Sequence, residues 1–368
     1  MRIAFRTDAS IDIGTGHVMR CLTLADALRE RGAASRFICR THPGNLIDTI
    51  RHRGYEVRAL PLNDSPITSY ALPGDVLPAH ASWLGSDWVT DAQQTLAALS
   101  DTLVDWLIVD HYAIDAGWER SLRPACRNLM VIDDLADRFH DADLLLDQNL
   151  GRSSTDYSEL VPVGCKMLIG PKYALLRPEF AARRSGSLAR REKSSLKKIL
   201  ISMGGVDKDN VTGRILDMLR KVCLPPDCSI TVVMGTHAPW LAHVLERAET
   251  MSWRTDVQVN IRNMAQLMAD SDFAIGAAGT TAWERCCLGL PTAALILAEN
   301  QRQGAIALEA AGAVLLLDSL TNLEAELPAL LKKLTQVEIL REMNKSCSAI
   351  TDGEGVTRLV AELLNVPA

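Results

Sequence analysis

The sequence predicts an α/β protein built on two parallel β-sheets. Short apolar runs that are typical of buried strands alternate with segments of helical periodicity through residues 1–150. The same alternation resumes at residue 198, after a stretch rich in basic and small polar residues. The chain has 368 residues, which is more than one hydrophobic core usually supports. We therefore expect two Rossmann-like domains, each a parallel sheet covered by helices.

The first element is a strand that leads through a glycine turn into a helix. The run MRIAFR predicts a short buried strand, and apolar residues then recur at helical spacing up to Gly32: Met19, Leu22, Ala25 and Leu28. Between the two, Gly14 and Gly16 allow a tight turn and a close approach to a ligand. Free N–H groups in the first helical turn favour an anion. We expect His17 to face that anion, although a capping or solvated histidine is the commoner explanation of such a segment taken alone.

Four further runs extend the expected first sheet: SRFIC, DWLIVD, NLMVID and DLLLD. Each holds apolar or β-branched residues between polar turns, as parallel strands with helices on both faces do. The rhythm fails between Leu60 and Trp88, where four prolines occur and charges are few. Because low charge disfavours free disorder, we expect an ordered excursion or lid over residues 60–90.

A second change of composition separates the two halves. Basic and small polar residues fill positions 181–198, AARRSGSLARREKSSLKK, which predicts a solvated interdomain linker. Strand-like runs follow it: KILISMGG, SITVVMG, DVQVNI, DFAIGA and TAALIL. The tail from Asn322 to Leu364 has a helical pattern. The expected parts are an N-terminal domain at 1–180, the linker at 181–198, a second domain at 199–345, and a C-terminal helix at 346–368 for which packing against the first domain is one option.

Composition disfavours several classes of protein. The formal net charge of −6 argues against a general nucleic-acid binder. No apolar stretch approaches membrane-spanning length and no leader precedes the first strand, so we expect a cytoplasmic protein without a membrane partner. The nine cysteines lack C-x-x-C spacing and are expected to be reduced core thiols. We expect neither a metal nor a cofactor, and the sequence is compatible with a monomer.

Ligands of open parallel sheets gather beyond the carboxyl ends of the strands, where the first half of the chain carries many polar residues. They are Arg6 and Asp8 after the first strand, Asp110, His111 and Tyr112 after DWLIV, Asp133 and Asp134 after NLMVI, and Gln148 and Asn149 after DLLLD. The acid pair has a second interpretation, because either aspartate can cap a helix. Convergence at one edge favours a site that contains His17 and Tyr112. The residues expected to bind substrate there are Arg6, Asp8, Gly14, Gly16, Asp110 and His111.

The second half contains two segments suited to a nucleotide. SMGG places Met203, Gly204 and Gly205 directly after a strand, and GAAGTTAWE begins a helix at Gly279, Thr280 and Thr281, with Glu284 in its first turn. Helix N–H groups and hydroxyls suit phosphate oxygens, and a carboxylate can accept both ribose hydroxyls. A capping box of Thr281 and Glu284 is the alternative. Neither a P-loop nor G-x-G-x-x-G occurs, which disfavours an ATPase or a dehydrogenase.

Seven segments together resemble one family. They are FRTDASIDIGTGHVMRC, WLGSDW, IVDHYAID, IDDLADR, YALLRPEF, ISMGGVD and AAGTTAWE. In this order they resemble the PseG family, the UDP-sugar hydrolases of pseudaminic acid biosynthesis, which are similar in fold to MurG-type glycosyltransferases. The match covers nearly the whole chain. It excludes the portion beyond about Leu320, and the Pro-rich excursion is absent from the shortest members.

The resemblance implies a GT-B architecture, in which two Rossmann-like domains face each other across a cleft. It implies hydrolysis of UDP-2,4-diacetamido-2,4,6-trideoxy-β-L-altropyranose to the free sugar and UDP. The catalytic histidine of the family and its D-H-Y tyrosine fall on His17 and Tyr112. Its nucleotide-binding segments fall on Met203–Gly205, on Gly279–Thr281, on Glu284, and on the ENQ of residues 299–301, which contains Asn300 and Gln301. Where some relatives carry serines, this chain has Thr280 and Thr281, which keep the hydroxyl.

These assignments predict a division of labour between the domains. The second domain binds UDP, with Glu284 on the ribose, while His17 takes a proton from the attacking water and Tyr112 holds that water or a sugar substituent. Attack at the anomeric carbon predicts inversion there. Three alternatives stay open: a GT-B transferase that moves the sugar to an acceptor hydroxyl, a nucleotide-sugar sensor without catalysis, and a legionaminic-type hydrolase that also epimerises the sugar.

Overall fold

The computed structural model describes residues 1–63, 78–193, 195–236, 238–317, 323–334 and 336–365. Contacts divide the chain into two compact units: unit 1 contains Met1–Leu175 and Val356–Ala368, and unit 2 contains Leu176–Gly355. Each unit has its own parallel sheet and its own hydrophobic core. Residues 64–77 of the predicted excursion or lid lie outside the described residues, whereas 60–63 and 78–90 are described.

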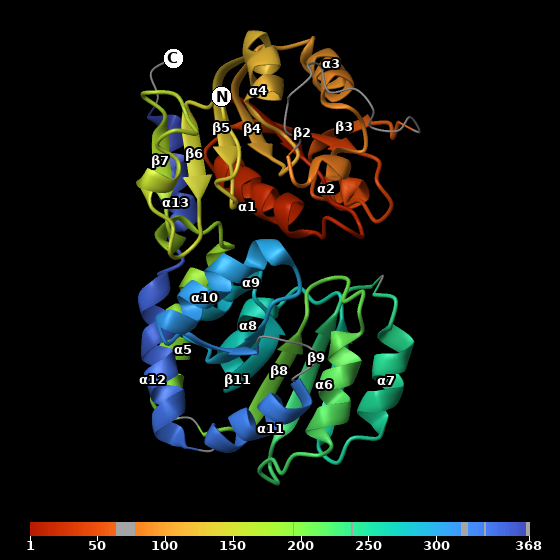
Figure 1. The fold of residues 1–368 in the computed structure, drawn as a ribbon, viewed down its shortest axis with the longest axis vertical. Helices are drawn as coiled ribbons and strands as arrows, with labels where there is room; N and C mark the ends of the chain where they lie inside the picture. The colour runs from red at the N-terminus through yellow and green to blue at the C-terminus, as the bar shows by residue number, and fades with distance from the viewer. Residues whose placement is uncertain (64–77, 194, 237, 318–322, 335, 366–368) are drawn as a thin grey trace. The chain divides into compact units, whose positions relative to one another are not determined.

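Unit 1 is built on seven parallel strands in the order β3-β2-β1-β4-β5-β6-β7 (Figure 1). Their bounds are β1 Arg2–Thr7, β2 Ala34–Arg40, β3 Glu56–Leu60, β4 Val104–Asp110, β5 Cys126–Ile132, β6 Leu144–Asp147 and β7 Lys166–Ile169. Phe5 of β1 pairs with Phe37 of β2 and Ile108 of β4, so the apolar runs form the centre of the sheet. The edge strands β3 and β7 were not predicted, because β3 is largely exposed and β7 has only four residues.

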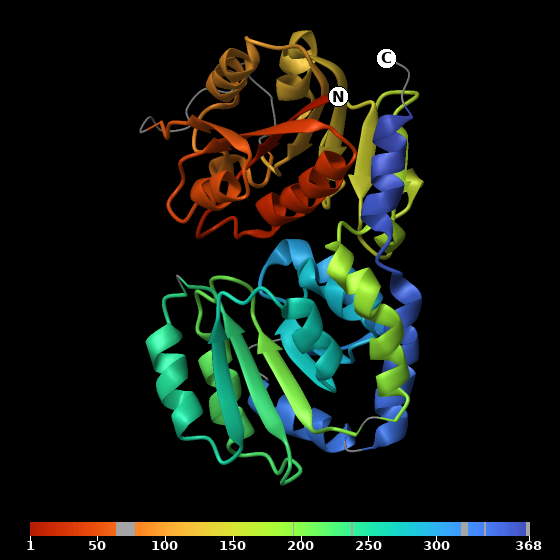
Figure 2. The same cartoon turned by 180° about the vertical axis from the view of Figure 1, so that it is seen from behind.

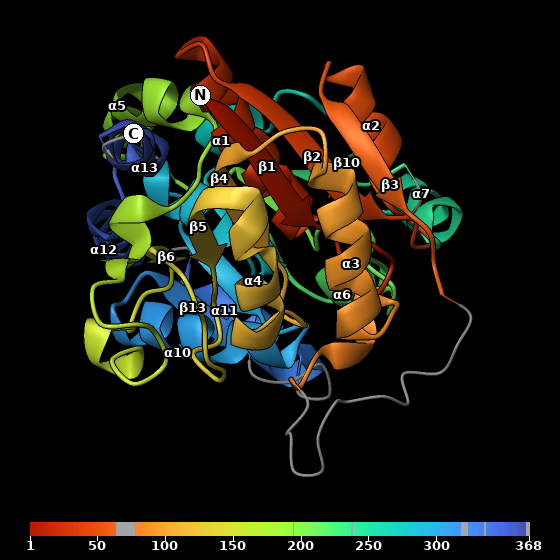
Figure 3. The same ribbon diagram turned by 90° about the horizontal axis from the view of Figure 1, so that it is seen from above.

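Helices cover both faces of this sheet. They are α1 Gly16–Glu30, α2 Ile47–His52, α3 Trp88–Leu99, α4 Ala116–Leu122 and α13 Gly355–Leu364, with 3-10 turns η1 Ala81–Leu84, η2 Arg123–Ala125, η3 Ser154–Asp156 and η4 Pro171–Tyr173. Leu22 of α1 and Leu359 of α13 share a core with Phe5, whereas Trp118 of α4 belongs to the core of the opposite face. α3 and α4 lie side by side (Figure 3).

The last helix of the chain, α13, packs in unit 1. It runs beside β6 and β7 (Figure 2), where Lys166 of β7 forms an ion pair with Glu362. The indole Nε1 of Trp106 donates to the carbonyl of Leu363 at 3.2 Å. The boundary between the units therefore falls at Gly355, rather than at residue 345 as the sequence pattern suggested.

Unit 2 is built on six parallel strands in the order β10-β9-β8-β11-β12-β13. Their bounds are β8 Lys198–Ser202, β9 Ser229–Met234, β10 Arg254–Val259, β11 Phe273–Ala277, β12 Thr292–Leu295 and β13 Val314–Leu317. The helices are α5 Pro178–Arg191, α6 Val211–Leu219, α7 Leu241–Glu249, α8 Met264–Asp270, α9 Thr281–Cys287, α10 Arg302–Ala310, α11 Leu323–Lys333 and α12 Val337–Ile350, with the 3-10 turn η5 Glu299–Gln301. β13 was not predicted, since a short apolar run also fits a buried helix.

The segment predicted as a solvated linker is mostly the helix α5. Its arginines bind backbone carbonyls of unit 2 instead of solvent: Arg191 Nη2 donates to Met268 at 2.6 Å, and Arg184 Nη2 donates to Ser348 at 2.6 Å. Met268 lies in α8 and Ser348 near the end of α12, where carbonyl groups lack helical partners. The basic run therefore caps neighbouring helices, a role that its composition alone does not reveal.

The structure also addresses the expected reduced thiols and the expected lack of a membrane-spanning segment. All nine cysteines are described and none forms a disulfide. Burial raises the pKa of Cys126 and of Cys287 to about 11, which keeps both as thiols at neutral pH. Within the described ranges, no helix has the length and apolar character that a membrane crossing requires.

Candidate active site

The carboxyl ends of β1 and β4 bring predicted residues of unit 1 together. The two strands are paired, with Asp110 beside the last residue of β1, so the segments that follow them are neighbours. Between β1 and α1 the chain turns at Gly14, whose φ of +79° lies in the left-handed region that favours glycine. The Gly14 N–H donates to the carbonyl of Ser10 at 2.9 Å and closes the turn. α1 then begins at Gly16, so its first turn places His17 at this edge.

His17 is held by Asp110. Its Nδ1 atom lies 2.6 Å from Asp110 Oδ1, and an ionised carboxylate can only accept, so Nδ1 carries a proton. In the neutral imidazole, this contact selects the tautomer with the lone pair on Nε2. Arg20, one turn later, grips the same carboxylate through Nε and Nη2 at 2.6 Å each. Burial by itself raises the pKa of Asp110, but Arg20 and His17 hold it well below its ordinary value. Asp110 is fully buried, so it supports His17 and does not line the site as predicted.

Tyr112 is fixed beside His17. The two rings meet edge-on, with centroids 4.5 Å apart. The Tyr112 hydroxyl donates to Asp134 Oδ2 at 2.6 Å, and Arg20 Nη1 donates to the same oxygen at 2.7 Å. Burial and the charge of Asp134 raise the pKa of Tyr112 well above its ordinary value. The phenol therefore stays protonated, which suits it to positioning rather than to proton transfer.

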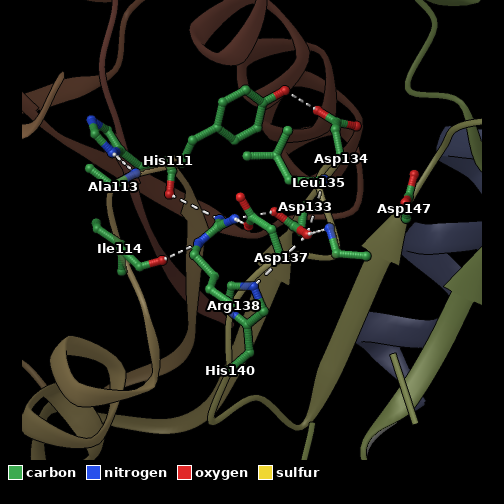
Figure 4. A network of polar contacts seen from close by, with 12 residues as sticks. His111, Ala113, Ile114, Asp133, Asp134, Leu135, Asp137, Arg138, His140 and Asp147 are labelled. Carbon is green, nitrogen blue, oxygen red and sulfur yellow. Dashed lines mark hydrogen bonds and ion pairs between the residues drawn. The ribbon is translucent and has the colours of Figure 1, made fainter. Parts of the chain in front are cut away.

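Asp133 and Asp134, the predicted acid pair, have different surroundings (Figure 4). Asp133 is buried, forms an ion pair with Arg138 at 2.8 Å and accepts from the N–H of Ala136 at 2.8 Å. It holds the loop after β5, a structural role close to the predicted cap. Asp134 instead belongs to the site through Tyr112. Neighbouring sequence positions thus serve separate purposes, and the sequence pattern did not distinguish them.

Arg6, Asp8 and His111 lie beneath the site. Arg6 and Asp8 have no exposed surface, and the guanidinium of Arg6 contacts Asp8 at 2.8 Å and Asp91 of α3 at 2.7 Å. His111 Nε2 lies 3.3 Å from Asp8 Oδ2, and burial lowers the pKa of His111. Side chains sealed inside the unit do not contact a substrate as predicted. They tie β1 to α3 and to the loop after β4.

Arg20 is a residue of this site that sequence analysis missed. It follows His17 by three positions on α1, so the two side chains share one face of the helix. That spacing is the only local signal, because both of its carboxylate partners lie at least 90 positions away.

Among the described residues, no group of three or more His, Cys, Asp or Glu side chains is arranged to hold a metal ion.

In unit 2, the loop after β8 contains the predicted Met203, Gly204 and Gly205. Met203 is buried, and Gly204 has a φ of +88°. A Cβ at Gly235 would lie 2.0 Å from the carbonyl oxygen of Gly205, so the loops after β8 and β9 meet backbone to backbone. The carboxylate of Asp207 accepts from the first N–H groups of α6 at 2.9 Å. The left-handed φ explains Gly204, and the close approach explains Gly235. The predicted contact of this loop with a nucleotide rests on the family resemblance.

The N-terminus of α9 has no side-chain cap. No side-chain hydrogen bond caps the helix at Thr280, and Thr281 Oγ1 accepts from Arg285 Nη1 at 3.2 Å. The alternative capping box of Thr281 with Glu284 is therefore not formed. The first N–H groups of the helix, together with the threonine hydroxyls, remain suited to phosphate oxygens.

The turn η5 lies beside the start of α9. A Cβ at Gly279 would meet Gln301 Nε2 at 3.4 Å, and Gln301 Oε1 accepts from the N–H of Leu297 at 3.1 Å. Asn300 Oδ1 is buried without a hydrogen-bond partner in the part of the chain that the structure describes. The structure thus brings together the predicted residues of α9 and η5, with one acceptor still to be satisfied.

Glu284, in the first turn of α9, has an unusual ionisation. Its Oε1 atom lies 3.8 Å from Arg177 Nη2, and its side chain is 17% exposed. Burial raises the pKa of Glu284 to about 7, although the charge of Arg177 acts in the opposite direction. The carboxyl group therefore titrates near neutral pH, where most glutamates are fully ionised.

Comparison with known proteins finds relatives that match most of the chain. No family model matches the chain. The chain is 26% identical to UDP-2,4-diacetamido-2,4,6-trideoxy-beta-L-altropyranose hydrolase of Campylobacter jejuni over 307 aligned residues. The alignment covers 83% of this chain and 95% of that protein. Over 323 residues the chain is 27% identical to an uncharacterized protein of Methanocaldococcus jannaschii, and it spans 57% of that relative's length. The crystal structure of Acinetobacter baumannii MurG matches with a TM-score of 0.69 at 15% identity and covers 99% of both chains.

Two parallel-sheet α/β units and the likeness to MurG show a fold of the GT-B type, which confirms the predicted fold class. Within that class, the chain is similar to the Campylobacter jejuni hydrolase over nearly that protein's whole length. This similarity confirms the resemblance to the PseG family that the sequence motifs indicated.

Proposed function

We propose that the protein hydrolyses UDP-2,4-diacetamido-2,4,6-trideoxy-β-L-altropyranose, releasing the free sugar and UDP. One observation carries the proposal: a buried, ionised Asp110 anchors Nδ1 of His17, which leaves Nε2 as a proton acceptor. The similarity to the Campylobacter jejuni hydrolase supports the choice of substrate.

In the proposed reaction, His17 Nε2 takes a proton from water as the water oxygen bonds to the anomeric carbon. The bond between that carbon and the diphosphate oxygen breaks, and its electron pair leaves with UDP. Asp110 stabilises the imidazolium that forms, and the proton then passes to solvent. Because water attacks opposite the leaving group, the anomeric carbon is inverted.

Unit 2 supplies the UDP site in this proposal. The N–H groups at the start of α9 and the hydroxyls of Thr280 and Thr281 offset the diphosphate charge, so the reaction needs neither a divalent metal nor a cofactor. Glu284 accepts hydrogen bonds from the ribose hydroxyls. For hydrolysis by this mechanism, the sugar of the bound nucleotide must reach His17 of unit 1.

We also propose that the enzyme is cytoplasmic.

UDP is expected to bind more tightly at pH 8 than at pH 6. Because the pKa of Glu284 is about 7, the carboxylate that accepts both ribose hydroxyls is mostly protonated at pH 6 and mostly ionised at pH 8. A binding mode that needs the ionised form weakens by up to about tenfold one unit below that pKa. Isothermal titration calorimetry across this range tests the expectation.

Glu284→Gln is the control for the pH dependence, since the phosphate groups of UDP titrate equally with both proteins. The variant is expected to show a flatter pH profile than the unmodified protein. Identical profiles for the two proteins contradict the role of Glu284 in ribose binding.

The decisive experiment is incubation with a panel of UDP-diamino sugars in heavy-oxygen water, without any acceptor. We expect one heavy oxygen atom on the released sugar and none on UDP, because attack falls on the anomeric carbon. Mass spectrometry locates the label, and proton NMR of the product ring reports inversion at the anomeric carbon and any epimerisation. Label found on UDP excludes the proposed mechanism.

A glycosyltransferase is the second candidate function, favoured by the likeness to MurG over the whole chain. The same base would then deprotonate an acceptor hydroxyl instead of water. Sugar release in buffer that lacks an acceptor supports the hydrolase, whereas consumption of the nucleotide sugar only after an acceptor alcohol is added supports the transferase.

A further inference from the structure

Two further rings lie against Tyr112. The Trp83 ring stacks on the Tyr112 ring, with centroids 5.8 Å apart and planes inclined by 25°. The His80 ring lies 4.3 Å from Trp83 and 5.5 Å from Tyr112, between centroids. Because Tyr112 also meets His17 edge-on, the rings form one connected group that reaches the proposed base. His80, Trp83 and Tyr112 are termed the aromatic shelf below.

The backbone that carries Trp83 is fixed by its neighbours. Trp83 lies in η1, whose Leu84 is buried in the core of unit 1. Gly85 follows with a left-handed φ of +64°, and a Cβ there would lie 2.6 Å from the His42 ring, so only glycine fits. Asn63 Nδ2 donates to Ser86 Oγ at 2.8 Å. A ring held in this way needs little further ordering when a ligand binds.

The shelf is the apolar part of the candidate site in unit 1. His80 and Trp83 are half-buried, so part of each ring surface is accessible. Burial lowers the pKa of His80, which keeps its imidazole uncharged at neutral pH. The charged groups behind His17, Asp110 and Arg20, are engaged with each other. Asp137 and Arg138, the charged groups that act on His80, are likewise bound to each other at 2.9 Å. A ligand that reaches His17 past the shelf therefore meets aromatic surface beside paired charges.

We propose that Trp83, with His80 beside it, selects the sugar by stacking against its apolar groups while His17 acts at the anomeric carbon. This inference rests on the proposed function. The proposed substrate is unusually apolar for a sugar, because C6 is a methyl group and each acetamido group carries another methyl. An indole offers a wide, flat surface to such groups, and stacking contacts of this kind change affinity by up to about tenfold. Sugars with a hydroxymethyl group at C6 lose part of that contact.

Kinetics of Trp83→Leu and Trp83→Phe test the role of the indole. For the diacetamido trideoxy substrate we expect Trp83→Leu to raise KM by about tenfold, with kcat changed by less than about threefold and the UDP dissociation constant unchanged. Trp83→Phe is expected to recover part of the loss. The preference for this substrate over UDP-N-acetylglucosamine should shrink in the order Trp, Phe, Leu. Trp88→Leu is the matched control, since Trp88 is a half-buried tryptophan of the same unit outside the shelf.

Binding of free sugars separates this inference from the proposed function. Saturation-transfer NMR with N-acetylglucosamine and its 6-deoxy counterpart needs no turnover. We expect stronger transfer to the C6 methyl and acetamido methyl protons than to the ring protons, and its loss in Trp83→Leu. If no UDP-sugar is hydrolysed but this transfer is seen, the proposed hydrolase function is wrong, whereas stacking of Trp83 on the sugar is supported.

An unchanged KM and an unchanged preference in folded Trp83→Leu overturn the inference, as does methyl transfer equal to that of the unmodified protein. If Trp83→Leu does not fold, Trp83→Phe decides by the same measurements. A phenylalanine variant that matches the tryptophan protein in KM, preference and transfer also overturns it.

Discussion

Replacing His17 by asparagine or alanine is expected to lower kcat by about a hundred- to ten-thousand-fold, the contribution of one positioned general base. Only Nε2 of His17 is available to take the proton, because Nδ1 is bound to Asp110 at 2.6 Å. UDP affinity should change by less than about twofold, since the proposed UDP site lies in unit 2. Steady-state kinetics and calorimetry on the same preparations measure the two quantities.

His52→Asn is the matched control for the His17 variants. His52 is an exposed histidine at the end of α2 in the same unit, and its Nδ1 atom lies 2.6 Å from the carbonyl oxygen of Asp48 in the same helix. It should retain full turnover. A His17 variant that turns over at the normal rate excludes His17 as the base.

Asp110→Asn is expected to cause the second largest loss, about a hundredfold or more in kcat. An amide cannot replace the carboxylate, because its N–H group favours the tautomer of His17 in which Nε2 carries the proton. The substitution also leaves the Arg20 guanidinium without its main buried counterion, so the free energy of unfolding should fall by about 3–5 kcal/mol. Activity is therefore measured at a temperature where circular dichroism shows the variant folded.

Asp105→Asn, on the same strand β4, separates the special role of Asp110 from a general effect on the strand. Asp105 binds the exposed Arg127 at 2.6 Å, and a surface ion pair contributes only about 0–1 kcal/mol. Its kcat should remain normal. A folded Asp110→Asn protein with normal kcat contradicts the proposed support of His17.

Apolar patterning was sufficient for the centre of both sheets. β1, β4 and β5 each contain an unbroken apolar stretch, IAF, WLIV and LMVI, because helices cover both faces of the sheet. Burial on two sides is therefore visible in the sequence of each strand. β3 cannot be predicted in this way, since most of its residues are exposed and it contains no such run. The sequence pattern predicts a linker where α5 forms, because the arginines of α5 bind carbonyl groups that belong to other helices and are not visible in its own sequence.

The candidate site shows the same division. The position of His17 behind two glycines and the polar ends of the strands were visible in the sequence. That Arg6 and Asp8 are sealed beneath the site was not, because a polar residue after a strand can point either to solvent or into a buried ion pair. Asp133 and Asp134 likewise have different partners in the folded chain, since Asp133 pairs with Arg138 and Asp134 accepts from Tyr112.

The α/β class, the two parallel sheets, the strand–glycine–helix opening and the family resemblance can all be predicted from the amino-acid sequence, since each depends on residues close together along the chain. Three contacts become visible only in the folded protein: Asp110 holds His17 across 93 positions, Arg20 reaches Asp134 across 114, and Trp83 stacks on Tyr112. These contacts follow from the order in which strands pair and from how helices pack on them. No local pattern of residues encodes that order, so the partners of a catalytic group are visible only in the folded chain.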